Sequence, residues 1–114
     1  MSCDEAINTA FEDVGLHIYP NVYTGEELSY LVYTYYVIPA VFADSVSHAA
    51  RYSIQLHLYL PQKTNPNTYK LAIIAACYEN GFTFPSMTNA SDGDGQHYVF
   101  EFEYCNGGGY YGET

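Results

Sequence analysis

The clearest pattern along the chain is a strict alternation of apolar and polar positions over residues 51–60. Such alternation is typical of a β-strand with one covered face and one exposed face. The side chains that we expect to face a core are Tyr52, Ile54, Leu56, Leu58 and Leu60. Residues 96–104 show the same alternation and predict a second strand of this kind. Its inward residues are Tyr98, Phe100 and Phe102, and its outward residues are His97, Glu101 and Glu103.

Residues 29–38 lack this alternation because apolar and tyrosine side chains occupy both faces of the predicted strand. A strand that is apolar on both faces is usually central in a sheet or covered by a partner on its second face. This strand is also the richest in tyrosine, whose large apolar ring and polar tip suit half-buried interface positions. The segment therefore predicts either a central strand or a contact with another chain.

Two segments have helical periodicity instead. The first opens at Ser2, which forms a capping box with Glu5, and it ends at Gly15. The second opens with Asn65 as its cap and Pro66 at its first position, and it ends near Gly81. This second helix is apolar almost all round, which is typical of a helix buried on more than one side. A chain this short can hardly cover both sides alone, so we expect a neighbouring subunit.

The remaining elements complete an α+β order of α-β-β-β-α-β-β. A short strand is predicted over 16–19, stopping at Pro20, and another over 82–88, interrupted by Pro85. A long loop is predicted over 40–50 and a hairpin turn over 89–95. We therefore expect a mixed or antiparallel sheet of about four to five strands with two helices packed on one face. Residues 1–105 are predicted to form one domain, and 106–114 a Gly-rich flexible tail.

Charge and composition exclude several classes of function. Three Lys and Arg residues stand against thirteen Asp and Glu residues, for a formal net charge of −10. Sequence-specific nucleic-acid binding and binding to an anionic membrane surface both need clustered cations, so we expect neither. No segment has the pattern of a signal peptide or a membrane span. The three cysteines form no CxxC pair, which favours a reduced, intracellular setting.

The residues with reactive side chains form no catalytic pattern, so the sequence predicts no enzyme, no cofactor and no metal site. His57 and His97 could lie on the same exposed sheet face and meet there, but solvent-facing sheet histidines are the favoured interpretation. Asp92 and Asp94, each followed by Gly, favour a hairpin turn over a calcium loop. Cys77 lies among apolar neighbours, where a nucleophilic thiolate is disfavoured.

An ordered set of short motifs runs along most of the chain. After the first helix come Pro20-x-x-Tyr23-Thr24-Gly25, Tyr33-x-Tyr35-Tyr36 with Pro39, and Phe42-Ala43-Asp44. They are followed by Gln55-x-His57-x-Tyr59, Gly81-Phe82 and His97-x-x-Phe100-Glu101. In this order the motifs resemble the small tail terminator or tail completion proteins, which join heads to tails in long-tailed bacteriophages and prophages.

This resemblance implies a structural virion protein that is made in the bacterial cytoplasm and resides in the tail or neck of the particle. It implies a homohexameric ring that contacts the tail tube protein and the head–tail connector protein. The residues that we expect at the oligomer interface are Tyr33, Tyr35, Phe42, Ile74 and Tyr78. Glu101 and Glu103 are candidates for an acidic lumen along which DNA slides.

Two alternatives stay open. The first is a non-catalytic protein-binding module, an adaptor or small inhibitor, that uses the tyrosine-rich strand. The second is a small enzyme or metal protein that uses His57, His97 or Asp92.

Overall fold

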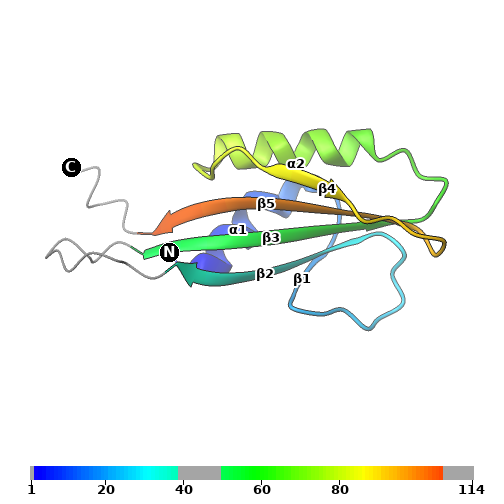
Figure 1. Cartoon of the computed structure of the whole chain (residues 1–114), viewed down its shortest axis with the longest axis horizontal. Helices are drawn as coiled ribbons and strands as arrows, with labels where there is room; N and C mark the ends of the chain where they lie inside the picture. The colour runs from blue at the N-terminus through cyan, green and yellow to red at the C-terminus, as the bar shows by residue number, and fades with distance from the viewer. Residues whose placement is uncertain (1, 39–49, 107–114) are drawn as a thin grey trace, which may run out of the picture.

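The computed structural model describes residues 2–38 and 50–106 (Figure 1). The helices are α1 (Cys3–Phe11) and α2 (Asn67–Glu79), and a short 3₁₀ turn, Glu12–Val14, follows α1. The strands are β1 (Ile18–Pro20), β2 (Tyr30–Ile38), β3 (Ala50–Leu60), β4 (Ser86–Asn89) and β5 (Gln96–Asn106). The predicted tail over 106–114 lies almost wholly outside the described residues, as does the predicted loop over 40–50 with its interface residue Phe42.

The five strands form one mixed sheet in the order β1-β2-β3-β5-β4. Strand β1 runs parallel to β2, whereas β2 with β3, β3 with β5, and β4 with β5 are antiparallel. The two long strands β3 and β5 therefore lie side by side in the middle (Figure 1). The predicted α+β class, with two helices and about four to five strands, is confirmed.

The ends of α1 are set by local chemistry. The backbone N–H of Glu5 donates to the Ser2 hydroxyl, and the Glu5 carboxylate accepts from the N–H of Ser2, which is the predicted capping box. After the 3₁₀ turn the chain reverses at Gly15, whose φ of 98° is a left-handed conformation that glycine adopts easily.

The start of α2 also follows the sequence. The Asn65 side chain accepts a hydrogen bond of 3.0 Å from the N–H of Asn67, and Pro66 already has helical backbone angles. The helix ends before Gly81, which has a φ of 78°. Neither described helix is long and apolar enough to cross a membrane.

Both helices pack on the same face of the sheet, because side chains of α1, α2 and the inward positions of the strands form a single buried cluster. Phe11 of α1 lies at its centre, with ring centroids 5.8 Å from Phe102 and 6.0 Å from Phe82. The predicted inward residues of β3 and β5 belong to this core, with Tyr52 packed at its margin. Neither described helix covers the opposite face of the sheet.

The two short strands differ most from the prediction. The first short strand begins at Ile18 and includes Pro20, where the sequence suggested 16–19. Strand β4 begins only at Ser86, after Pro85, because proline has no backbone N–H to donate to a neighbouring strand. Phe82, predicted to lie in that strand, instead fills the core from the preceding connection.

Candidate functional site

The uncovered face of the sheet, called here the open face, carries a continuous row of six aromatic rings. In order the row contains Tyr19, Tyr23, Tyr30, Tyr59, His97 and His57. Successive ring centroids are 4.2–5.1 Å apart, and every ring is half-buried. Val32, which pairs with Tyr19 and His57 on this face, is only 6% exposed. The row thus forms a thin second apolar layer on the open face.

The row ends in a pair of histidines that contact each other. His57 Nδ1 and His97 Nε2 are 2.8 Å apart, so the N–H of one ring donates a hydrogen bond to the ring nitrogen of the other. The two histidines therefore meet on the sheet face that they were predicted to share, and both are half-buried, so the favoured interpretation of solvent-facing histidines is corrected. Burial lowers the pKa of both imidazoles, and for His57 the proximity of His97 lowers it further. The carboxylates of Glu101 and Asp92 act in the opposite direction, on His57 and His97 respectively.

This pair predicts a loss of stability in weak acid. Because the folded-state pKa of each histidine lies below its unfolded value of about 6.5, the unfolded chain binds protons more readily. The free energy of unfolding should therefore be highest above about pH 6.5 and fall as the pH drops through that value. Thermal melts by circular dichroism between about pH 7.5 and about pH 5 will measure this. In the double variant His57→Gln, His97→Gln we expect a flatter curve, and an unchanged slope would contradict the assignment.

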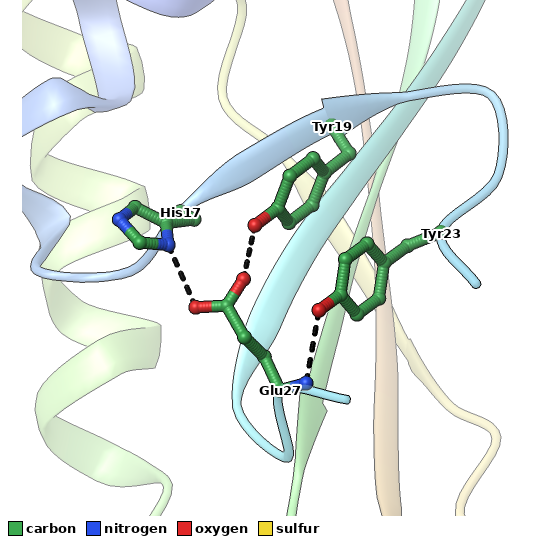
Figure 2. A network of polar contacts seen from close by, with 4 residues as sticks. All are labelled: His17, Tyr19, Tyr23 and Glu27. Atoms are coloured by element: carbon green, nitrogen blue, oxygen red, sulfur yellow. Dashed lines mark hydrogen bonds and ion pairs between the residues drawn. The ribbon is translucent and has the colours of Figure 1, made fainter. Parts of the chain in front are cut away.

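A second polar network lies at the other end of the row, centred on Glu27 (Figure 2). One oxygen of the Glu27 carboxylate lies 2.6 Å from His17 Nδ1, and the other accepts a hydrogen bond from the Tyr19 hydroxyl. The backbone N–H of Glu27 donates to the Tyr23 hydroxyl at 2.9 Å. The Tyr19 hydroxyl lowers the pKa of Glu27, and the carboxylate in turn raises the pKa of Tyr19 to about 12. The network ties the loop before β2 to β1.

Close packing in the same loop explains one of the sequence motifs. The ring of Tyr23 lies against Gly25, where a Cβ atom would overlap it. Asn21 turns the chain with a φ of 67°, a left-handed conformation that asparagine tolerates better than most residues. The Pro20-x-x-Tyr23-Thr24-Gly25 segment therefore places Tyr23 in the aromatic row, which sequence spacing alone does not reveal.

The pKa of Tyr19 provides a test of its hydrogen bond to Glu27. Replacing Glu27 with Gln removes the negative charge that disfavours the ionised phenol, so the pKa of Tyr19 should fall from about 12 towards its usual value of about 10. Carbon-13 NMR of labelled tyrosine rings in mild alkali measures this shift. Glu26→Gln removes a charge from the neighbouring exposed residue and is the matched control. Equal effects of the two variants would exclude a specific contact.

A third polar contact joins α1 to β2. The hydroxyls of Tyr33 and Tyr35 both donate to the Asp4 carboxylate, at 2.6 and 2.8 Å. These bonds lower the pKa of Asp4, and the pKa of each tyrosine is raised to about 12, mainly by burial for Tyr33 and by the hydrogen bond for Tyr35. Tyr33 is 3% exposed and belongs to the core, so the prediction of an interface role for it is corrected. Tyr35 lies at the surface.

The outer side of α2 carries an apolar stripe of Leu71, Ile74, Ala75 and Tyr78, at helical spacings of three and four residues. Leu71 is 67% exposed, Tyr78 is 84% exposed and Ile74 is half-buried. The buried stripe of the same helix is formed by Ile73, Ala76 and Cys77. The helix is thus apolar on its outer side as well as on its core side, as the sequence predicts. Two predicted interface residues, Ile74 and Tyr78, lie in this α2 stripe.

The two candidate lumen residues lie where the alternation predicted, on the open face of β5. Glu101 accepts a hydrogen bond of 2.9 Å from the Gln55 side-chain amide. Glu103 forms an ion pair of 2.7 Å with Arg51. Both partners come from β3, so the two carboxylates are held across the central pair of strands.

The remaining reactive side chains lie apart. Among residues 2–38 and 50–106, no three His, Cys, Asp or Glu side chains group closely enough to hold a metal ion. Asp92 accepts a hydrogen bond from the N–H of Asp94 at 2.9 Å within the hairpin connection, as expected for a turn. Burial raises the pKa of Cys3 to about 11 and that of Cys77 to about 12, which disfavours their thiolates.

Comparison of the chain with protein-family models and with curated proteins gives no match. The surfaces described above are therefore the basis for its functional interpretation.

Proposed function

We propose that this chain is a structural assembly protein, a ring-forming tail terminator or tail completion protein at the head–tail junction of a long-tailed bacteriophage. The observation that carries the proposal is the α2 stripe. A Leu and a Tyr side chain each bury apolar area worth about 1.5–3 kcal/mol when covered, so leaving both in water is unfavourable. The stripe lies on the side of α2 that faces away from the core, where a second subunit can cover it.

The ordered motifs of the sequence give this assembly its proposed identity and partners. The copies of the chain form a hexameric ring, and the ring contacts the tail tube protein on one side and the head–tail connector protein on the other. The protein is made in the bacterial host cytoplasm and resides in the tail or neck of the virion. The α2 stripe and Tyr35 are the proposed subunit contacts on the described part of the chain.

The open face is the proposed lining of the ring. Glu101 and Glu103 point from this face, and negative charges there would repel DNA phosphates and so limit adhesion. The test is a map of the assembled ring by electron microscopy. A position of both residues on the outer rim would refute this part of the proposal.

The mass of the protein in solution tests the proposed self-assembly. Sedimentation velocity and light scattering over a roughly 100-fold range of concentration should show a species of about six copies. Negative-stain images of that species should show rings. A monomer at every concentration, in isolation and with tail tubes added, would contradict the proposal.

An alternative is a non-catalytic binding module that uses β2. It is favoured by the exposure of neighbouring apolar side chains on this strand, since Tyr36 is 64% exposed and Val37 is 53% exposed. A stable monomer or dimer that forms a defined complex with one other protein would support this alternative.

A further inference from the structure

Half of strand β2 has an open edge. Strand β1 pairs only with Leu31, Val32 and Tyr33. The backbone N–H of Leu31 donates to His17 and the carbonyl of Tyr33 accepts from Asn21, so the odd-numbered residues direct their polar groups towards this edge. Because the direction alternates along a strand, the N–H and C=O groups of Tyr35 and Val37 point the same way. No described strand pairs with β2 there beyond Tyr33.

The opposite edge of the sheet is formed by β4, all four residues of which are exposed. The N–H of Ala90 donates to the carbonyl of His97, so even-numbered residues of this segment face β5. The backbone groups of Met87 and Asn89 therefore point outward. An edge of this kind is a template for pairing with another strand.

These two edges match each other in direction, length and charge. Strands β2 and β4 run in opposite directions within the sheet, so a copy in the same orientation brings β4 antiparallel to the next β2. The four residues of β4 fit the free segment 34–38. Neither segment contains a charged residue, so the two edges do not repel each other although the net charge of the chain is −10. Such edges usually carry charges or prolines that prevent pairing, and segment 34–38 has neither.

The side chains match as well. Pairing that sets Tyr35 opposite Asn89 and Val37 opposite Met87 satisfies the outward backbone groups of both strands. Val37 and Met87, both exposed in the single chain, then meet on the helix side of the sheet. Tyr36 lies opposite Thr88 on the open face. Aromatic and β-branched residues are favourable cross-strand partners.

We infer that the free half of β2 pairs with β4 of a second copy of the chain, so that the sheet continues head to tail from copy to copy. The inference rests on the proposed self-assembly and specifies the subunit interface. A head-to-tail contact uses two different surfaces of each copy. Successive copies therefore form a closed ring when the rotations between neighbours add up to a full turn. All helices then lie on one side of the continuous sheet and all open faces on the other.

The same arrangement brings the helix layers of neighbouring copies together. Asp4 of α1 accepts a hydrogen bond from Tyr33 of β2, and Nζ of Lys70 in α2 lies 4.0 Å from the centroid of the Tyr98 ring on β5. On the face that the helices share, α1 therefore lies over the β2 half of the sheet and α2 over the β5 half. When β4 pairs with the next β2, α2 is placed towards the α1 of that copy. Backbone pairing and contacts between α2 and the neighbouring α1 can thus contribute to one interface.

Disulfide trapping tests the inference. Tyr36→Cys and Thr88→Cys introduce thiols at two exposed positions that form a non-hydrogen-bonded pair, in which Cα atoms are about 4.5 Å apart, within the range of a disulfide. The variant also carries Cys105→Ser, because Cys105 is less buried than the other cysteines. Under mild oxidation we expect most of the protein to run as a ladder of covalent oligomers on non-reducing gels, and as monomer after reduction. Circular dichroism under reducing conditions verifies the fold.

Two matched variants distinguish the outcomes. Tyr36→Cys with Thr68→Cys places the second thiol on exposed α2 surface and should give no ladder. Tyr36→Cys alone would form a covalent dimer if two β2 edges paired with each other, and that result would overturn the inference. Rings without a Tyr36–Thr88 cross-link would also overturn it while leaving the proposed function intact. A monomer without a cross-link would overturn both.

Discussion

Replacing Leu71 and Tyr78 with aspartate is expected to abolish self-association of the chain while leaving its fold intact. Both side chains are largely exposed in the single chain, so their loss costs little folding free energy. In an assembly each would bury apolar area worth about 1.5–3 kcal/mol, so the double variant should lose at least about 3 kcal/mol of association energy. This corresponds to a decrease of more than about 100-fold in the association constant. Sedimentation velocity measures the effect.

The control adds the same charge outside α2. Thr24→Asp with Gln62→Glu changes two exposed polar residues outside both helices and likewise adds two negative charges. If this control weakens assembly as much as the stripe variant, general repulsion between acidic chains is the cause. If neither variant weakens assembly, the α2 stripe is not a subunit contact.

Replacing Phe11 with alanine should have the largest effect on folding. Phe11 is fully buried and its ring packs against Phe82 and Phe102, so truncation leaves a cavity between α1 and β5. Such truncations cost about 3–5 kcal/mol, a large part of the total stability of about 5–15 kcal/mol of a typical domain. We expect the midpoint of thermal unfolding to fall by more than about 10 °C. Circular dichroism melts and urea titrations measure the change.

The matched control is Phe84→Ala, which removes the same ring from a position that is 79% exposed. Its effect should stay within about 0.5 kcal/mol. A large loss for Phe84→Ala would mean that this ring has a partner in solution, and a small loss for Phe11→Ala would contradict the core described above.

Much of the fold follows from local sequence patterns. The alternation in 51–60 and 96–104 identifies the inward residues of β3 and β5, and capping residues mark the starts of both helices. The interface prediction failed at Tyr33 because β2 is apolar on both faces, so its pattern does not reveal which face the helices cover. The strand predicted over 82–88 is shortened because Pro85 has no backbone N–H to donate to a neighbouring strand.

The open-face site depends on information that the sequence does not contain. The β3–β5 register sets Tyr59 opposite His97 and His57 opposite Val99, so His57 and His97 are diagonal neighbours on the open face. The alternation of residues along each strand does not determine this register. The Glu27 network forms because the loop before β2 folds back onto β1, a path set by Asn21 and by the packing of Tyr23 on Gly25. In the sequence this loop carries the motif Pro20-x-x-Tyr23-Thr24-Gly25.

The place of β5 in the sheet also has a consequence for synthesis on the ribosome. β5 is the last described strand along the chain, yet it lies between β3 and β4. Until residue 106 has left the ribosome exit tunnel, β3 has only one of its two neighbours and β4 has none among the described strands. Contacts between distant segments form slowly, and His57 and His97, on the two central strands, are 40 residues apart. The sheet is therefore completed only after translation has passed β5, and shorter nascent chains leave the β3 edge unpaired and lack the core side chains Tyr98, Phe100 and Phe102.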